Sequence, residues 1–345
     1  MALENSVLTP TIIKDLLKDH YGIVVVSVRK IRLGSANCYY VSDKSRLYFL
    51  KEFQSGFEAE DLIRESNLVD FLAERNIPVA RFIKTVSGKP FFVYGGHLIC
   101  LEEFIDGRTY NYDDLPAELL DEAAQMLGKL HQAMQDYPLP EDMGKAWLDS
   151  YSADKLVSEY DALLKIASNT PNDKNTARIT TDLEYKKELA YRCNDYIKYY
   201  DGVTYSPTHG DYQGCQLISA DGHIKAVIDF SSARRLPITW EIMRSYVQSS
   251  VQCRKNAVID VNGFCRYVRE YTKHYPLTET DLAAMPYVYL FQLARSKYGY
   301  TQYLTTESED NEDLLEFAFW RTDMCREVEK KLNQLSKSLM EITKN

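Results

Sequence analysis

The pattern of hydrophobic and polar positions divides the chain into a strand-rich first part and a helix-rich remainder. Short runs of β-branched and aromatic residues, bounded by turn-forming residues, predict β-strands at 23–28, 38–41, 47–53, 88–94 and 98–101. Thr9 and Pro10 are typical of a helix cap and a first helical residue, so a helix is expected from there through Leu17. A second helix is expected before Pro78, because apolar residues recur with helical spacing at 63–72.

Helical patterns dominate from Leu119 onward, and one short strand-like region at 208–230 is embedded among them. A strand-rich half that is followed by a helix-rich half predicts an α+β fold with two lobes. We expect a small, β-rich N-terminal lobe over 1–103 and a larger, helical C-terminal lobe over 104–345, with the linker at 102–107.

The charge of the chain narrows the choice of partners. Its 345 residues carry a net charge of −9, which argues against nucleic acid or an anionic membrane as the main partner. An acidic protein is compatible with a cationic small-molecule substrate.

The N-terminal residues, the apolar stretches and the cysteines predict the cellular compartment of the protein. The first residues lack a basic region followed by an apolar run, so no signal peptide is expected, and no apolar stretch reaches the roughly 18 residues of a membrane span. Seven cysteines are scattered without a C-x-x-C pair. We expect thiols in a reducing, cytoplasmic environment.

The most informative segment carries two carboxylates and an amide. Asp211 follows a His-Gly turn, Gln216 comes five residues after it, and Asp229 lies in the apolar run Val227–Phe230. Phosphoryl transfer needs a carboxylate that orients a hydroxyl, together with an amide and a carboxylate that hold magnesium on a nucleotide. Turn chemistry is the alternative for either Asp alone. The spacing of the pair favours the catalytic interpretation.

The segment resembles the H-G-D-x-x-x-x-N and I-D-F motifs of the aminoglycoside phosphotransferase and choline kinase superfamily, whose two Asp residues stand eighteen residues apart, as Asp211 and Asp229 do. The resemblance implies a protein-kinase-like fold and an ATP- and Mg²⁺-dependent small-molecule kinase. Asp211 would be the catalytic residue, and Gln216 and Asp229 the metal ligands. Gln216 stands where the family has Asn, and its extra methylene must shift the metal geometry.

The same resemblance assigns residues of the N-terminal lobe to the nucleotide. Lys51 would bind the α- and β-phosphates and pair with Glu65 on the next helix. Nearby alternatives for this partner are Glu58, Glu60 and Asp61, although such charges are more often solvated. Gly34 and Asn37 lie in the stretch that resembles the loop covering the nucleotide. An outward-facing strand lysine and a plain β-turn are the alternatives from spacing alone.

The linker is expected to bind adenine through its backbone, with the carbonyl of Glu103 and the N–H of Ile105 at the matching positions. His131, His209 and Glu241 resemble structural residues of the family. Glu241 is expected to cap or brace the helix beneath the catalytic loop, and contact with the substrate is the alternative.

The implied activity is phosphorylation of a hydroxyl on a small molecule, with aminoglycosides, choline, homoserine and sugar-like compounds among the acceptors of similar families. Two alternatives stay open. Gln216 also suits a catalytically impaired kinase-like binding protein, such as the spore-coat proteins of this superfamily. A structural protein that never binds nucleotide is the second. The sequence does not tell the acceptor, the choice between ATP and GTP, or the oligomeric state.

Overall fold

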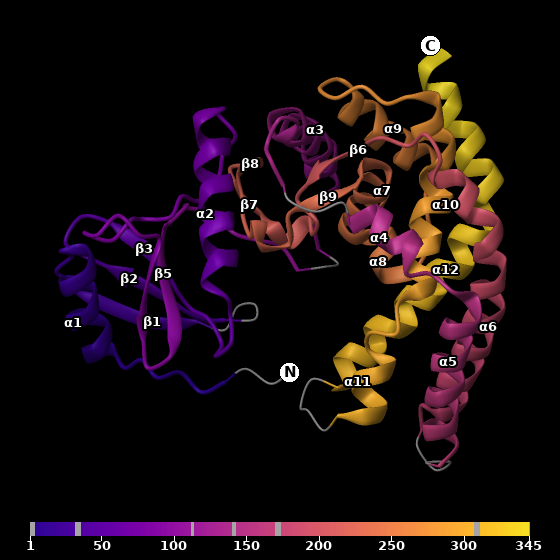
Figure 1. Cartoon of the computed structure of the whole chain (residues 1–345). Helices are drawn as coiled ribbons and strands as arrows, with labels where there is room; N and C mark the ends of the chain where they lie inside the picture. Colours follow the sequence, from indigo (N-terminus) through magenta and orange to yellow (C-terminus); the bar gives the residue numbers. More distant parts are fainter. Residues whose placement is uncertain are drawn as a thin grey trace. The chain divides into compact units, whose positions relative to one another are not determined.

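The computed structural model describes residues 4–31, 36–111, 114–139, 143–169, 174–306 and 311–344. It contains two compact units. The first consists of Met1–Thr109 and Gln216–Ser232, and the second of Tyr110–Cys215 and Ala233–Asn345. The predicted α+β fold is confirmed, with an antiparallel sheet in the first unit and mainly helices in the second (Figure 1).

The first unit is built on a five-stranded antiparallel sheet with the strand order β1-β2-β3-β5-β4. The strands are β1 (Ser27–Ile31), β2 (Asn37–Ser42), β3 (Leu47–Glu52), β4 (Phe91–Tyr94) and β5 (His97–Glu103). Lys51 in β3 pairs in register with Cys38 on one side and Cys100 on the other. Because side chains alternate between the two faces of a sheet, Lys51 and Leu50 point in opposite directions.

Helix α1 (Pro10–Tyr21) covers one face of this sheet. Thr9 caps it by accepting the N–H of Ile12, and Ile13 and Leu17 pack with Leu50 and other buried strand residues into one hydrophobic core. The helix therefore begins where the Thr-Pro pair predicts. The second predicted helix is α2 (Ala59–Glu74), which ends before Pro78.

The first predicted strand begins later than its β-branched residues suggest. β1 starts at Ser27, whereas Val24 and Val26, which are 68% and 54% exposed, precede the strand, and the Val26 N–H bonds β2 through the Ser42 carbonyl at 2.7 Å. Strand propensity depends on a partner that covers the residue, and the register of β1 with β2 starts only at Ser27 and Ser42.

The strand-like region of the motif forms the hairpin of β7 (Leu217–Ala220) and β8 (His223–Val227), which belongs to the first unit. Backbone hydrogen bonds join Val227 N–H to the Pro78 carbonyl at 2.9 Å and link Arg108 with Ser219 in both directions. Because the hairpin belongs to the first unit, the two compact units do not correspond to a single boundary between residues 103 and 104. The lobe boundary at that point stays a prediction.

Gly107 permits the approach of the hairpin to the linker. Its φ is +152°, and a Cβ atom there would lie 2.8 Å from both the carbonyl oxygen of Ser219 and the side chain of Ile218. Any larger residue would have to displace the strand backbone.

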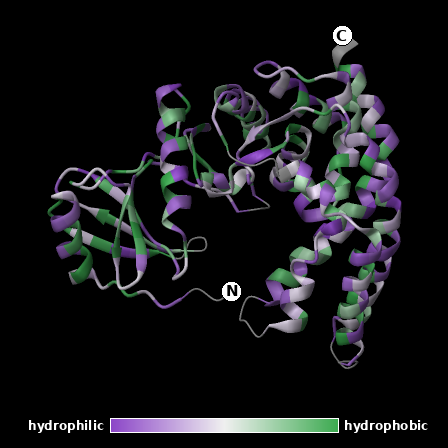
Figure 2. Cartoon of the chain, in the orientation of Figure 1, coloured by the Kyte–Doolittle hydropathy of each residue, from purple (hydrophilic) through white to green (hydrophobic). Residues whose placement is uncertain are grey.

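The second unit is a helical body. Its helices are α3 (Ala117–Met134), α4 (Met143–Asp149), α5 (Ala153–Ser168), α6 (Thr176–Tyr196), α7 (Ile238–Ser249), α8 (Val251–Asn256), α9 (Val261–Thr272), α10 (Glu279–Arg295), α11 (Tyr300–Thr305) and α12 (Asn311–Met340). The pairs α10 with α12 and α5 with α6 pack extensively, and hydrophobic and hydrophilic residues share each long helix (Figure 2). The short strands β6 (Tyr205–Thr208) and β9 (Arg234–Pro237) pair antiparallel beside them.

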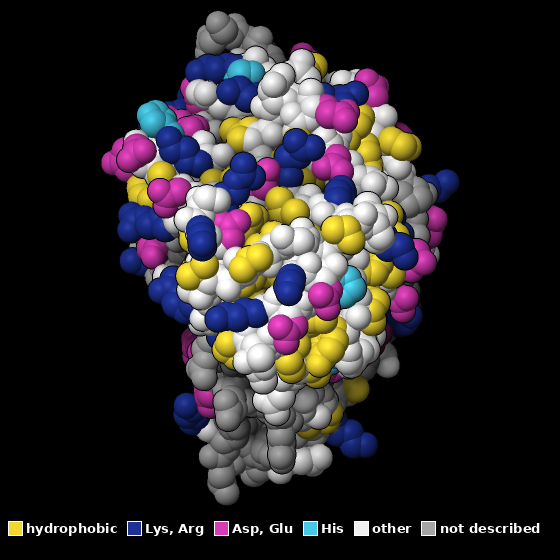
Figure 3. Space-filling view, turned by 90° about the vertical axis from the view of Figure 1, so that its left-hand side faces the viewer, with side chains coloured by type: hydrophobic (Ala, Val, Ile, Leu, Met, Phe, Trp, Pro, Cys, Tyr) yellow, Lys and Arg dark blue, Asp and Glu magenta, His cyan; other side chains and the backbone are white. Residues whose placement is uncertain are grey.

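Three further observations concern the helices, the surface and the cysteines. In the described part of the chain, no helix is long and apolar enough to cross a membrane. Acidic and basic side chains are interspersed across the face seen in Figure 3. All seven cysteines lie within the described ranges, and none of them forms a disulfide.

Candidate active site

One buried carboxylate holds the loop that follows β6. Glu241, in the first turn of α7, is fully buried and accepts the backbone N–H groups of His209, at 2.9 Å, and of Gly210. It also bonds Nε2 of His131 at 2.8 Å. Burial of a carboxylate is unfavourable unless its oxygens are bonded, and three donors satisfy this one. The resemblance predicts that Glu241 caps or braces the helix beneath the catalytic loop, whereas its hydrogen bonds reach the loop itself.

The protonation of this cluster follows from its partners. Nδ1 of His131 lies 2.8 Å from the hydroxyl of Tyr271, which can donate to it while Nε2–H donates to Glu241. Burial raises the pKa of the Glu241 carboxyl, but the hydrogen bond from His131 and the nearby His209 outweigh it, so the net shift is downward. Glu241 is therefore held as the anion.

Asp211 comes directly after this braced turn. Gly210 has a φ of +81°, a conformation that suits glycine, and Asp211 therefore lies at the end of the turn. The carboxylate of Asp211 accepts hydrogen bonds from Arg244 and, at 3.2 Å, from Nε2 of Gln213. Its side chain keeps 29% of its surface exposed. Asp211 is thus an oriented, accessible carboxylate.

Arg244 is a site residue that the sequence analysis did not identify. It lies on α7, one turn after Glu241, so that one helix supplies both the group that braces the loop and the group that pairs with Asp211. The signal was present in the i,i+3 spacing of Glu241 and Arg244, although spacing alone does not say that Asp211 faces this helix.

In the first unit, Lys51 pairs with Glu102 rather than with the predicted Glu65. The Nζ of Lys51 lies 2.8 Å from Oε1 of Glu102, and the lysine side chain is only 18% exposed. Burial opposes the charge of Lys51, but the carboxylates of Glu102 and Glu65 outweigh it and hold its pKa well above the ordinary value. Lys51 is thus a fixed cation with two acidic neighbours.

Glu65 has a different contact. Its Oε1 accepts the backbone N–H of Phe230 at 2.9 Å, so it connects α2 to the segment directly after Asp229. Burial, opposed by Lys51 and reinforced by Glu102 and Asp229, raises the pKa of Glu65 to about 7.

The predicted metal ligands lie together in the first unit. Nε2 of Gln216 is 3.3 Å from Oδ2 of Asp229, the hydroxyl of Ser231 donates to Oδ1 of Asp229 at 2.7 Å, and Ile228 N–H bonds the Gln216 carbonyl at 3.0 Å. Asp229 has a φ of +65°, which is strained for a residue other than glycine and is frequent at functional sites.

This donor set fits a magnesium ion. Mg²⁺ is commonly bound by one or two protein oxygens together with substrate phosphates and water. The Gln216 amide can turn its oxygen toward Asp229, since the oxygen and nitrogen ends of an amide are assigned from the hydrogen bonds around them. The extra methylene of Gln216 therefore does not keep its side chain away from Asp229.

The remaining nucleotide-site predictions differ in their support. Gly34 lies outside the described residues. Asn37 is buried, and its amide donates to the carbonyl of Glu4 at 3.1 Å, so its assignment rests on the resemblance alone. Glu103 ends β5, and its N–H bonds the Arg81 carbonyl. In the described ranges, the Ile105 N–H has no hydrogen-bond acceptor, as a backbone donor for adenine requires.

The sequence and the fold were compared with those of known proteins. Residues 27–275 match the model of a family described as the phosphotransferase enzyme family. A homoserine kinase of Zymomonas mobilis subsp. mobilis is 25% identical over 263 residues, which cover 75% of this chain and 76% of that protein.

Two solved structures share the fold. A spectinomycin phosphotransferase in complex with ADP and spectinomycin has a TM-score of 0.63 at 18% identity, covering 96% of this chain and 100% of that one. The choline kinase of Cryptosporidium parvum Iowa II has a TM-score of 0.56 at 15% identity, covering 97% and 99%. The predicted family and the predicted kinase-like fold are confirmed.

The Glu241 cluster gives a pH-dependent prediction. Because the folded-state pKa of Glu241 lies below its ordinary value of 4.5, its stabilisation is fully present above that value and is lost as the pH falls through the folded-state pKa. We expect Glu241→Gln to lower the free energy of unfolding by on the order of 1–3 kcal/mol at neutral pH. The difference from the wild type should shrink on acidification, as measured by urea unfolding across this range.

Glu118→Gln is the matched control, since Glu118 is exposed in the first turn of α3. It should change the free energy of unfolding little at any pH. A constant difference between wild type and Glu241→Gln at every pH would contradict the assignment of an anionic Glu241.

Proposed function

Because the chain belongs to the phosphotransferase enzyme family and is a small-molecule kinase, we propose that it transfers the γ-phosphoryl group of ATP to a hydroxyl of a small molecule with Asp211 as the catalytic residue. The observation that carries this proposal is the orientation of Asp211. Its carboxylate is accessible and accepts a hydrogen bond from Arg244. The loop that carries Asp211 is hydrogen-bonded to the buried carboxylate of Glu241.

The reaction assigns a role to each part of this arrangement. Asp211 accepts a hydrogen bond from the acceptor hydroxyl and takes its proton as the oxygen attacks the γ-phosphorus. The new oxygen–phosphorus bond forms while the bond from the γ-phosphorus to the bridging oxygen breaks, and ADP leaves with that oxygen. Arg244 is a positioning residue, since its contact is with Asp211 rather than with the reacting atoms.

Residues of the first unit would bind the nucleotide. Lys51 is suited to the phosphates because Glu102 fixes its side chain and its high pKa keeps it charged. The Ile105 N–H and the Glu103 carbonyl would bind adenine. Gln216 and Asp229 would hold Mg²⁺, which neutralises phosphate charge when it is bound.

The relatives indicate a range of acceptors. The similar proteins named above are described as acting on homoserine, spectinomycin or choline, which share a hydroxyl group. For this chain the proposal at this level is a small hydroxyl compound. A cytoplasmic location stays a prediction.

The central assignment is tested at Asp211. We expect Asp211→Asn to lower kcat by on the order of 10²- to 10⁴-fold, because the amide cannot accept the proton of the hydroxyl. The affinity for ATP should stay nearly unchanged, because Asp211 is assigned to the acceptor. Steady-state kinetics and calorimetry with magnesium–ATP measure the two quantities.

Asp221→Asn is the matched control, because Asp221 lies in the exposed turn between β7 and β8 with a side chain that is 89% exposed. It should retain wild-type kcat. Wild-type turnover by Asp211→Asn would remove Asp211 from the catalytic role.

Gln216 supports a second candidate function, a catalytically impaired binding protein. Its amide nitrogen faces Asp229, so the amide must rotate before its oxygen can bind a cation. We nevertheless favour an active enzyme, because Gln216 reaches Asp229 and because Lys51, Asp211 and Asp229 are all present.

Gln216→Asn separates the two functions. In an active enzyme the metal site is built for glutamine, and the shorter asparagine side chain would reach the metal less well. Activity should therefore fall or change little. In an impaired protein the substitution should raise the affinity for magnesium and increase ATP turnover. Titrations of ATP turnover with magnesium, in the wild type and in Gln216→Asn, distinguish the two functions. A large gain of activity in the variant over an inactive wild type would favour the impaired protein.

A further inference from the structure

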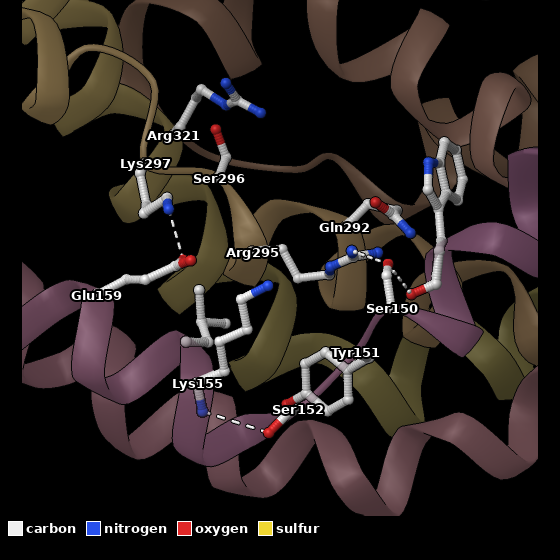
Figure 4. A pocket seen from close by; sticks show the side chains of 12 residues that line it. Ser150, Tyr151, Ser152, Lys155, Glu159, Gln292, Arg295, Ser296, Lys297 and Arg321 are labelled. Atoms are coloured by element: carbon white, nitrogen blue, oxygen red, sulfur yellow. Dashed lines mark hydrogen bonds and ion pairs between the residues drawn. The ribbon is translucent and has the colours of Figure 1, made fainter.

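The second unit contains a pocket whose charge was not predicted. The cavity has a volume of about 450 Å³ and is lined from α4, α5, α10, α12 and the segments beside them (Figure 4). A cavity of this size accommodates a small molecule. Four of its lining residues are basic and one is acidic, namely Lys155, Arg295, Lys297, Arg321 and Glu159.

The single acidic residue is already neutralised. Glu159 forms an ion pair with Lys297, whose Nζ lies 2.5 Å from the carboxylate. In the described part of the chain, neither Arg295 nor Arg321 has a carboxylate within ion-pair distance. Among the described residues the two guanidinium groups therefore lack a carboxylate partner, and aromatic rings lie near them, Phe291 at 5.6 Å from Arg295 and Phe317 at 5.4 Å from Arg321.

Both guanidinium groups also have unused donors. Nη1 of Arg295 and Nε of Arg321 are buried and bond no acceptor among the described residues, although Nη2 of Arg295 donates to Ser150 at 3.1 Å. An unsatisfied buried donor on a charged group is costly, and an anionic ligand would satisfy it.

Neighbouring acceptors are occupied by other groups. The carbonyl oxygens of Ala294 and Leu293, at the end of α10, accept from the hydroxyl of Tyr160 and the ammonium of Lys186. The helix end thus does not supply the acceptors that Arg295 lacks. Burial lowers the pKa of the Arg321 guanidinium, as expected for a cation without a counter-ion.

A chain of ring contacts connects this pocket to Asp211. Trp147, which lines the pocket, packs edge-to-face with Trp240 at a centroid distance of 5.3 Å. The guanidinium of Arg244 lies 5.5 Å from the Trp240 ring and pairs with Asp211. All of these residues belong to the second unit.

We infer that this pocket binds the acceptor and that the acceptor carries a carboxylate, which Arg295 and Arg321 recognise. The guanidinium group suits a carboxylate because it donates two parallel hydrogen bonds. Ser150, Ser152 and Gln292 offer further hydrogen bonds to the rest of the molecule. The inference rests on the proposed function for the acceptor's identity, and it differs from the cationic acceptor that the net charge permits.

The test compares hydroxyl compounds that differ in a carboxylate. The probes are L-homoserine with its decarboxylated amino alcohol, and D-gluconate with sorbitol. We expect the carboxylate member of at least one pair to be phosphorylated with a kcat/KM at least about tenfold higher than its partner. Arg321→Gln and Arg295→Gln should each raise the KM of that acceptor by about 10- to 100-fold, with the KM of ATP unchanged.

Arg266→Gln is the control, since Arg266 is exposed on α9 and pairs with Asp121 outside the pocket. It should leave both KM values unchanged. Equal kinetics for the two members of both pairs, or an unchanged acceptor KM in the Arg321 and Arg295 variants, would overturn the inference.

Calorimetry without ATP separates this inference from the proposed function. Carboxylate binding that is weakened by Arg321→Gln would support the inference about the pocket, even in a protein without turnover. Phosphoryl transfer only to uncharged or cationic alcohols would support the proposed function and overturn the inference about the pocket.

Inorganic phosphate is the third probe. Binding of phosphate but of neither carboxylate would contradict the assignment.

Discussion

The arrangement of the second unit depends on the burial of one charged carboxylate. Glu241 is fully enclosed, so its charge must be compensated, and the protein does this with His131 and with the N–H groups of His209 and Gly210. The compensation fixes the turn that presents Asp211. Since Trp240 and Arg244 lie on the same helix, the contacts of Asp211 and those of the pocket wall are set by one rigid element.

The first unit handles buried charge in another way. Lys51, Glu102 and Glu65 lie in a mostly buried cluster in which two carboxylates face one cation. Burial, reinforced by Glu102 and Asp229 and opposed by Lys51, raises the pKa of Glu65 to about 7, while the two carboxylates stabilise the Lys51 ammonium. Lys51 therefore stays charged in a buried position, as the proposed contact with nucleotide phosphates requires.

Much of the fold and part of the site could be predicted from the sequence. The Thr9-Pro10 cap and the apolar, aromatic-rich run at 47–53 are local signals, and they located α1 and the strand of Lys51 correctly. A structural role for Glu241 came from the resemblance, whereas its hydrogen bonds to the loop of Asp211 are seen only in the structure. The partner of Lys51 could not be read in this way, because the register of β3 with β5 places Glu102 beside it, and register depends on the assembled sheet.

The pocket was beyond sequence reasoning for a related reason. Arg295 is the last residue of α10 and Arg321 lies within α12, and basic residues on helices usually extend their charged ends to solvent. Their lack of counter-ions becomes visible only when α10 and α12 are packed together. The late start of β1 also depends on the assembled sheet, because its register with β2 begins only at Ser27.

The most direct test of the account is phosphorus NMR of the wild-type protein with magnesium, ATP and a panel of small hydroxyl compounds. The account predicts that the γ-phosphate signal of ATP disappears as a phosphomonoester signal of the acceptor and the signals of ADP grow in equal amounts. Release of inorganic phosphate alone, or unchanged ATP with every acceptor, would contradict the assignment of this chain as an active small-molecule kinase.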